Sequence, residues 1–357
     1  MLTPQQALDM FRSHDLIGIG MEADQMRRKF HPHNVASYII DRNINYTNVC
    51  TEYCSFCAFY RPNGHAEAYV HPKEVIFQKI QETIDLGGTG VLMQGGLHPD
   101  LPIEWYEDLF RSIKQNYKIQ LHVLSAPEIL NIAEISKLSI SDTIARLRDA
   151  GLDSIPGAGA EILHDEVRAR IARLKCNTEE WLSVHRAAHK LGVRTTATMM
   201  WGCGETIEHR IHHLQVLRDL QEETGGFTAF IPWSFQRDNT SLGRFVKEEA
   251  TSVEFLKTLA ICRLYLDNIV NIQTSWVTQG LKVCQVGLRF GGNDVGSVMI
   301  EENVVSSAGT TFCMGVADMQ RVIRDLGWEP RQRDNWYREV AAGTPTVPTA
   351  SVAAEKV

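Results

Sequence analysis

The sequence predicts an α/β protein whose parallel strands close into a TIM-type (β/α)8 barrel, with an open six-stranded partial barrel as the alternative. The main reason is that β-branched and aromatic runs alternate with runs of helical period along most of the chain. Several of the helical runs end at glycine, as helix C-termini often do. The length also fits, because 357 residues with 44% hydrophobic content can bury a barrel-sized core and leave room for extensions.

The chain begins with a segment, residues 4–30, that we expect to be helical. Leu8, Phe11 and Leu16 offer apolar faces there, and the segment has a basic end. Residues 1–40 are therefore expected to form an N-terminal helical extension. The next run, residues 35–50, is β-branched and aromatic enough for one or two short strands that lead into a cysteine-rich loop.

From there strands and helices alternate, and residues 41–330 are expected to form the barrel domain. The further strands are expected at 91–96, 119–125, 152–158, 194–202, 227–235, 271–276 and 285–292. The helices between them are expected at 72–87, 103–117, 140–151, 178–192, 206–225 and 252–268. Because the loops after parallel barrel strands converge at one end, we expect the functional site at the C-terminal ends of the strands. Residues 341–357 are small, contain Pro and Thr and are aperiodic, so we expect a disordered tail.

The charge and composition exclude several classes of protein. A net charge of −7 and the lack of a basic run argue against general binding to nucleic acid, which depends on clustered Lys and Arg. The N-terminal segment has no apolar stretch long enough to cross a bilayer, so no membrane association is expected. Eight cysteines without a secretory signal indicate a reducing compartment and favour a cytoplasmic enzyme. The histidines show no paired metal spacing, and His212 and His213 are expected to be solvated.

Three cysteines lie together in one short loop, as Cys50, Cys54 and Cys57 with the spacing C-x3-C-x2-C. They offer three thiolates to one centre, whereas a closed zinc or iron–sulfur site usually takes four ligands from the protein. An iron without a protein ligand can bind a small molecule directly, so the spacing favours cluster chemistry on a ligand. The alternatives are a partial zinc knuckle and buried apolar thiols. The remaining cysteines have no paired spacing and are interpreted as core or incidental thiols: Cys176, Cys203, Cys262, Cys284 and Cys313.

This loop, with Phe56 directly before its last cysteine, resembles that of the radical S-adenosylmethionine (SAM) enzymes. The resemblance implies that Cys50, Cys54 and Cys57 hold a 4Fe–4S cluster. It implies that SAM binds the open iron and that Phe56 lies against the adenine.

Further cofactor-binding residues are expected at the ends of later strands. Gly95 and Gly96 end one strand, where the missing Cβ atoms let backbone approach a ligand, and the resemblance assigns them to the amino group of SAM. Glu161 has a carboxylate suited to ribose hydroxyls or to the SAM ammonium, with a helix N-terminal Glu as the alternative. A similar role for adenine or the methionine carboxylate is expected of a third group: Gly202, Gly204 and Glu205.

The substrate side is expected to be a pocket with an aromatic wall and a few hydrogen-bonding groups. The candidates near strand ends are Ser125, Glu128, Trp233, Phe235, Gln236, Asn239, Asn293 and Asp294. Each aromatic among them could instead fill the core. The candidate catalytic bases are His65, His98, Glu128 and Asp294.

Several stretches narrow the resemblance to the dehypoxanthine futalosine cyclase group, which acts in the futalosine route to menaquinone. They are RNINYTNVC, CAFYR, LMQGGLHPDL, ETGGFTAFIPWSFQ and GGNDVGSVMIEENVVSSAG, within residues 40–330. The group implies that a 5′-deoxyadenosyl radical removes the ribose C4′ hydrogen of a nucleoside-like substrate, and that a reducing partner such as flavodoxin or ferredoxin supplies electrons. The alternatives are two related radical SAM groups, the aminofutalosine synthases and the deazaflavin chromophore synthases. An iron–sulfur electron carrier is the alternative of another class, but it would require a fourth ligand near the loop.

Overall fold

A computed structural model describes residues 2–340 of the chain. The expected tail, residues 341–357, lies outside the described residues. The N-terminal segment forms two helices, α1 (Pro4–Arg12) and α2 (Leu16–Phe30), and not the single helix that the periodicity suggested. The break has a local cause, since Ser13 is extended and Asp15 caps the second helix by accepting a hydrogen bond of 2.8 Å from the backbone N–H of Gly18.

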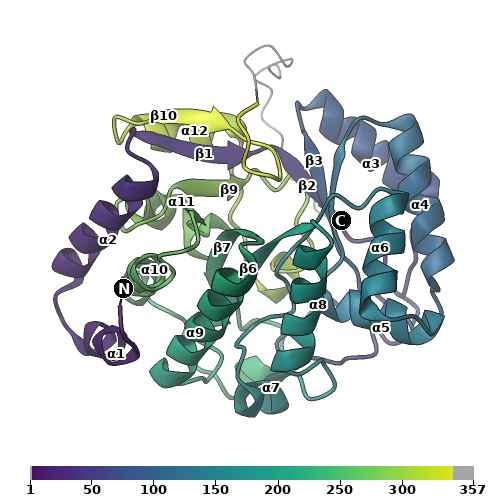
Figure 1. Cartoon of the computed structure of the whole chain (residues 1–357), viewed down its shortest axis with the longest axis horizontal. Helices are drawn as coiled ribbons and strands as arrows, with labels where there is room; N and C mark the ends of the chain where they lie inside the picture. Colours follow the sequence, from purple (N-terminus) through teal and green to yellow (C-terminus); the bar gives the residue numbers. More distant parts are fainter. Residues whose placement is uncertain (1, 341–357) are drawn as a thin grey trace.

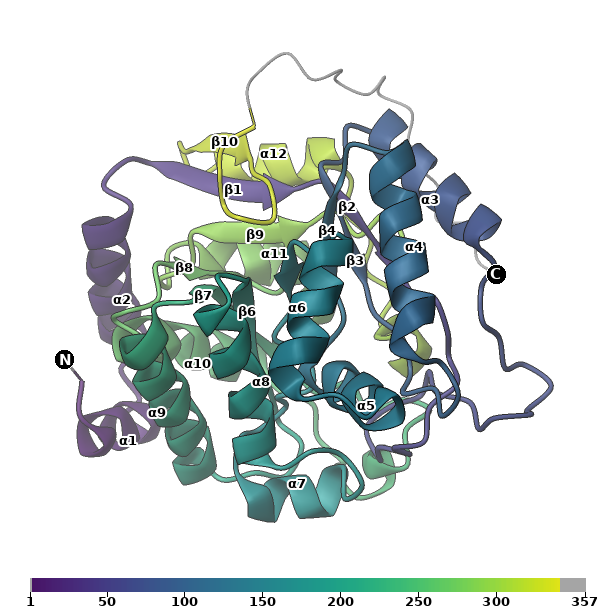
Figure 2. The same ribbon diagram turned by 45° about the vertical axis from the view of Figure 1, so that its right-hand side comes forward.

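Seven of the strands form one parallel sheet that curls like the wall of a barrel, and three more form a second sheet beside it (Figures 1 and 2). The order of the first sheet is β2-β3-β4-β5-β6-β7-β8, and the second sheet has the order β10-β1-β9. The two sheets are joined because β2 follows β1 after one residue and because Gln273 and Asp294 form a parallel bridge from the end of β8 to β9. The bounds are β1 (Val35–Ile39), β2 (Asp41–Ile44), β3 (Gly90–Met93), β4 (Gln120–Val123), β5 (Ser154–Ile155), β6 (Arg194–Trp201), β7 (Phe227–Ser234), β8 (Asn271–Ile272), β9 (Asp294–Ser297) and β10 (Glu329–Gln332). The parallel α/β barrel expected from the alternation is confirmed.

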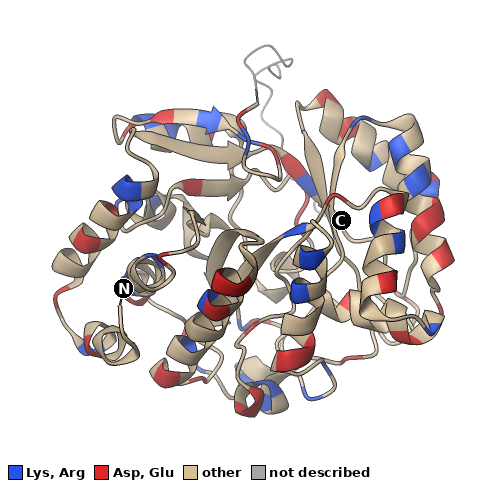
Figure 3. Cartoon of the chain, viewed as in Figure 1, with Lys and Arg blue, Asp and Glu red and all other residues tan. Residues whose placement is uncertain are grey.

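The helices cover the outside of this sheet, as Figures 1 and 2 show. They are α3 (Lys73–Asp85), α4 (Ile103–Asn116), α5 (Ala126–Ser136), α6 (Ile140–Ala150), α7 (Asp165–Ile171), α8 (Thr178–Lys190), α9 (Ile207–Thr224), α10 (Ser252–Tyr265), α11 (Trp276–Gly287) and α12 (Val316–Arg324), with short 3-10 turns η1 (Leu242–Arg244) and η2 (Ser306–Ala308). The main hydrophobic core lies between strands and helices, where Ile44, Val91 and Leu121 are 0% exposed. Figure 3 shows acidic and basic residues interspersed along the outer helices. Within residues 2–340, none of the helices has the length and apolar character that a membrane crossing requires.

Alternate side chains of the strands point inward, into what we call the barrel lumen. Register pairs place these residues on the inner face: Asn43, Leu92, His122 and Ser154 on β2 to β5, and Thr198, Ile231 and Trp233 on β6 and β7. Leu92, His122, Thr198, Ile231 and Trp233 are half-buried, although the strand residues beside them are fully buried. The surface that these side chains expose therefore faces the lumen.

The expected strand at 285–292 is wrong, because this segment forms the end of α11 and a glycine-containing turn. Val286, Leu288 and Phe290 alternate as strand residues do. In the structure, however, Cys284 and Leu288 are both 0% exposed at a spacing of four while Val286 is 43% exposed, which is a helical pattern. The strand of this region is β9, which begins only at Asp294.

The C-terminal segment closes the end of the barrel at which the strands begin. Strand β10 pairs in parallel with β1 (Figure 1), and the chain then turns so that Arg333 enters the barrel. Its guanidinium donates to both carboxylate oxygens of Asp294 on β9, at 2.6 and 2.8 Å, and lies 3.8 Å from the ring centroid of Tyr337. Asn335 fills the space left by Gly90, where a Cβ would lie 2.1 Å from the Asn335 amide nitrogen. Within residues 2–340, the C-terminal segment therefore covers the end of the lumen at which the strands begin.

Candidate active site

The three-cysteine loop follows β2 and is fixed at the open end of the barrel. The backbone N–H of Ser55 donates to the carbonyl of Ile171 at 2.8 Å, and the carbonyl of Ser55 accepts from the N–H of Leu242 at 2.8 Å. Within the loop, the N–H of Cys57 donates to the carbonyl of Cys54 at 3.1 Å. The loop is thus bound to the end of α7 and to η1, which follow β5 and β7.

The three thiols do not form a closed site for a single metal ion. Zinc with Zn–S bonds of about 2.3 Å would hold its sulfurs roughly 3.8 Å apart. Among residues 2–340, the one group of metal-ligating side chains whose ligand atoms all lie within 4.8 Å of one another is elsewhere, so these three thiols are spread more widely than that. Burial raises the pKa of Cys50, and that of Cys54 to about 12, so both must release a proton when they bind iron.

Gly95 and Gly96 let the end of β3 approach the cysteine loop. A Cβ on Gly96 would lie 2.1 Å from the carbonyl oxygen of Val49 and 2.8 Å from the Cβ of Cys50. The N–H of Gly95 donates to Glu128 at 2.9 Å and that of Gly96 to the carbonyl of Thr47 at 3.0 Å. Both N–H groups are therefore used within the protein, which leaves the carbonyl oxygens to accept from an ammonium group.

Glu161 lies beside the loop and has an unused carboxylate oxygen. The side chain is 6% exposed, and its Oε1 accepts from the Lys175 ammonium at 3.1 Å. Its Oε2 is buried and has no hydrogen-bond partner among the described residues, although Arg168 is 3.7 Å away. The Lys175 ammonium also lies 5.5 Å from the ring centroid of Phe56. A buried acceptor without a donor costs free energy, so this oxygen fits a ligand hydroxyl or ammonium.

Lys175 was not among the sequence-based candidates. It lies in the loop after α7, far from the cysteines in the chain, and belongs to no motif. Its position beside Glu161 and Cys54 results only from folding. Burial raises the pKa of Cys50 and Cys54, and the positive charge of Lys175 lowers both in part.

The loop after β6 is closed by its own glutamate. Glu205 accepts from the N–H groups of Gly202 and Cys203, both at 2.8 Å, and pairs with Arg210 at 2.7 Å. Gly202 and Gly204 have positive φ values of 81° and 93°, which favour glycine. Because the Glu205 side chain is 0% exposed, it shapes the loop and is not free to contact a ligand. Contact through the two glycines stays a prediction.

The structure separates the expected substrate residues into two sets. Trp233 faces the lumen, and Phe235 is 4% exposed beyond it. Gln236 donates to Ser234 and accepts from Thr310, in the loop after β9. Asn239 donates to the Ser307 carbonyl from an exposed turn. These four residues come from the end of β7 and the loop after it, and their contact with substrate stays a prediction.

Ser125 and Glu128 instead form a buried cap outside the lumen. They are the capping residues of α5, and Glu128 is 2% exposed. Its Oε1 accepts from Tyr46 at 2.7 Å and from the Gly95 N–H, and its Oε2 accepts from the N–H and hydroxyl of Ser125. With both oxygens used in this way, Glu128 is not free to act as a base, and the expectation for both residues is corrected.

Asn293 and Asp294 lie at the wrong end of the barrel for substrate. They were expected to follow a strand, but Asn293 precedes β9 and Asp294 begins it, because the strand was assigned too early in the sequence. Asp294 is 0% exposed and bound to Arg333 and Ser37, and Asn293 accepts from Arg263 at 2.8 Å. Both are therefore structural residues of the closed end. The other candidate bases, His65 and His98, lie in loops outside the barrel, where each accepts a backbone N–H through Nδ1.

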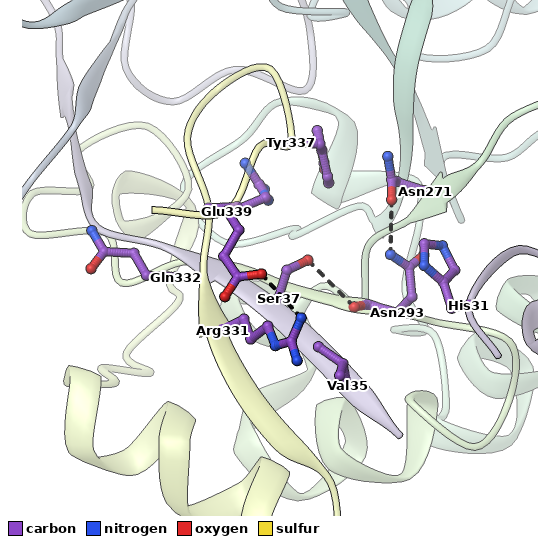
Figure 4. Close-up of a pocket in the computed structure, with 10 residues that line it drawn as sticks. His31, Val35, Ser37, Asn271, Asn293, Arg331, Gln332, Tyr337 and Glu339 are labelled. Atoms are coloured by element: carbon purple, nitrogen blue, oxygen red, sulfur yellow. Dashed lines mark hydrogen bonds and ion pairs between the residues drawn. The ribbon is translucent and has the colours of Figure 1, made fainter. Parts of the chain in front are cut away.

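A small pocket lies at this closed end, away from the cysteines (Figure 4). Ser37, Asn271 and Asn293 line one side of it, and the pair of Arg331 and Glu339, 3.0 Å apart, lies on the other. Because β1 and β8 begin here, the pocket is at the opposite end of the barrel from the cysteine loop.

The compact metal-ligating group consists of His164, Glu166 and His209 on the outer surface. His209 Nδ1 accepts from the N–H of Thr206 at 3.1 Å, so Nε2 carries the proton of the neutral ring and can bind a metal only if this cap is broken. The expectation that His213 is solvated is wrong, since it is 0% exposed and accepts from the N–H of Leu163 at 2.9 Å through Nδ1.

The parallel α/β fold and the three-cysteine loop after β2 together indicate the class of enzyme to which the chain belongs. Residues 44–217 match the radical SAM superfamily, and residues 224–344 match the CofH/MqnC C-terminal region. The chain belongs to the radical SAM superfamily. Membership implies a 4Fe–4S cluster and SAM, and Cys50, Cys54 and Cys57 have the required spacing.

Within this superfamily, the chain is similar over nearly its whole length to enzymes of more than one named kind. It is 48% identical to a cyclic dehypoxanthine futalosine synthase of Halalkalibacterium halodurans, over 94% of this chain and 90% of that protein. It is 44% identical to one of Streptomyces coelicolor, over 95% and 86%. An aminodeoxyfutalosine synthase of Thermus thermophilus is 38% identical, over 95% and 92%.

A solved structure supports the fold. Methylornithine synthase (PylB) has a TM-score of 0.71 at 18% identity and covers 92% of this chain and 94% of its own. At this identity the likeness concerns the fold alone.

Proposed function

We propose that this chain converts dehypoxanthine futalosine into cyclic dehypoxanthine futalosine, a step in the futalosine route to menaquinone. The observation that carries the proposal is the similarity to cyclic dehypoxanthine futalosine synthases at 44% to 48% identity over about 95% of the chain. The geometry supports it, because the cysteine loop and Glu161 adjoin a lumen with an aromatic wall. Relatives at 38% identity include an aminodeoxyfutalosine synthase, whose activity is the second candidate.

The residues around the loop suit the two cofactors. Cys50, Cys54 and Cys57 would hold the cluster, and Phe56 would cover the adenine. The orphaned oxygen of Glu161 would accept from a ribose hydroxyl or from the ammonium of SAM, and the carbonyls of Gly95 and Gly96 would accept from the same ammonium. When bound, the cluster and SAM together supply a 5′-deoxyadenosyl radical.

The protein itself contributes binding, orientation and exclusion of water. The half-buried lumen residues would hold the ribose C4′–H bond beside the adenosyl carbon, since a barrel closed at one end by Arg333 admits substrate only from the other. The substrate loses the C4′ hydrogen, its C4′ bonds to the benzoate ring, and the ring then loses an electron and a proton to become aromatic again.

The electron that first reduces the cluster would come from a small reducing protein such as flavodoxin or ferredoxin. A cytoplasmic location would supply such a partner and keep the cysteines reduced, in keeping with their free state in the described residues.

Anaerobic turnover with substrate deuterated at ribose C4′ tests the proposal. We expect deuterium in released 5′-deoxyadenosine and a product with the substrate skeleton and two hydrogens fewer. A Cys54→Ala enzyme is the control and should form neither. Adenosine covalently joined to the product would instead assign the chain to the second candidate activity.

A further inference from the structure

His122 is a titratable side chain that faces the lumen and has no evident role in the fold. It lies on the inner face of β4, paired with Leu92 on β3 and with Ser154 on β5. Its strand neighbours Leu121 and Val123 are 0% exposed in the outer core, whereas His122 is only half-buried. The part of the ring that remains accessible therefore lies inside the barrel.

One ring nitrogen is held and the other is open. Nδ1 lies 2.7 Å from the hydroxyl oxygen of Ser154, which is itself 2% exposed. Within residues 2–340, Nε2 has no hydrogen-bond partner. It also differs from the fully buried polar atoms that lack a partner, because it keeps some exposure to solvent. A ring that is anchored on one side and has a free nitrogen on the inner face of the sheet is arranged to exchange a proton with a ligand.

The surroundings keep this imidazole neutral. Burial, together with the positive charge of Arg333, lowers the pKa of His122 to about 3. The other charged groups at this depth come from β2 and β9. Asp294 is bound to Arg333, and Asp41 shares a hydrogen bond with Ser297. At neutral pH the ring can therefore accept a proton but has no excess proton to give.

We propose that His122 accepts, at Nε2, the proton that the substrate's aromatic ring loses at the end of the reaction. This inference rests on the proposed function. After C4′ has bonded to the ring, the C–H bond at that ring carbon breaks. The proton goes to Nε2, and one electron of the bond restores the aromatic system. The remaining electron passes to a one-electron acceptor of the iron–sulfur type, so that SAM is the net oxidant.

The weak basicity of this histidine suits the step. A ring that is returning to aromaticity while it loses an electron is a strong acid, so a neutral imidazole suffices if its geometry is right. The proposal requires the tautomer in which Nδ1–H donates to Ser154. Ser154 is then a positioning residue that fixes the ring.

The first experiment measures the ratio of cyclic product to 5′-deoxyadenosine. In His122→Gln, hydrogen abstraction should continue, with transfer of the C4′ deuterium, while the ratio falls by about 100-fold or more. Ser154→Ala should lower the ratio less. His33→Gln, at an exposed position outside the barrel, is the matched control and should keep the wild-type ratio. If product and 5′-deoxyadenosine fell together in His122→Gln, the role would be structural and the proposal overturned.

A wild-type enzyme that releases no 5′-deoxyadenosine would overturn the proposed function and not this inference alone. The second experiment needs no cofactor and uses ¹⁵N-histidine NMR of the wild-type protein, with the His122 signals identified as those that Ser154→Ala displaces. We expect Nδ1 protonated and Nε2 unprotonated from pH 5.5 to 8.5. A proton on Nε2 across this range would make the residue a donor and refute the proposal.

Discussion

Replacing Arg333 by methionine removes the cation at the closed end of the barrel and keeps a side chain of similar length. Arg333 is 8% exposed and its partner Asp294 is 0% exposed. The change removes two charge-assisted hydrogen bonds, of 2.6 and 2.8 Å, and leaves Asp294 buried with only Ser37 as a donor. Breaking a buried pair from one side costs about 3–5 kcal/mol, because an uncompensated charge remains.

The assay is thermal unfolding of the unloaded protein, followed by circular dichroism at a fixed scan rate. At roughly 2 °C per kcal/mol for a domain of this size, Arg333→Met should lower Tm by about 6–10 °C. Arg331→Met is the matched control two residues away. Its partners Glu329 and Glu339 are both exposed, so Tm should stay within error of the wild type.

A double variant separates charge from packing. Adding Asp294→Asn to Arg333→Met removes the unpaired charge, so at least half of the lost Tm should return. Either of two results would refute the reasoning: a single variant within about 2 °C of the wild type, or a double variant no more stable than the single one.

Three further outcomes are expected. Cys54→Ala should abolish cluster assembly, seen as loss of bound iron and of broad visible absorption after anaerobic reconstitution, while Cys313→Ala keeps both. Glu161→Gln should weaken SAM binding about 5- to 150-fold, on the scale of 1–3 kcal/mol for a lost buried acceptor, while the cluster still assembles; equal affinity by calorimetry would contradict the assigned contact. Burial raises the pKa of Asp41 from 3.8 to about 6. Between about pH 4 and pH 6 the folded state therefore keeps a proton that the unfolded state has released. The stability that this proton contributes is lost as the pH rises from about 4 to 6. Asp41→Asn should flatten the pH dependence of Tm in that window, and an unchanged slope would speak against a raised pKa.

The sequence predicted helices and strands correctly where one face of an element is buried and its apolar residues follow a regular local period. Strands β4, β6 and β7 fall within the expected ranges, and β3 begins one residue before its range, because their apolar runs end at polar or glycine residues. The strand predicted before β9 was wrong because Val286, Leu288 and Phe290 alternate by chance within a helix end and a turn. Only the packing of Cys284 and Leu288 into the same core distinguishes the two patterns.

The candidate site was predictable in part for the same reason. Glu161 was found because it follows a glycine-rich strand end, whereas Lys175, Arg333 and His122 carry no motif. Asp294 was misplaced, because a strand boundary wrong by several residues moves a side chain from one end of a barrel to the other.

What the sequence by itself determined is the chemistry of the cysteine loop. Cys50, Cys54 and Cys57 are neighbours along the chain, so covalent connection alone keeps their thiols together and leaves one ligand position open. The tertiary structure decided which distant residues complete the site. Glu161 reaches the loop, and His122 and Arg333 reach the lumen, through strand register and closure of the sheet, which depend on the burial of side chains along the whole barrel.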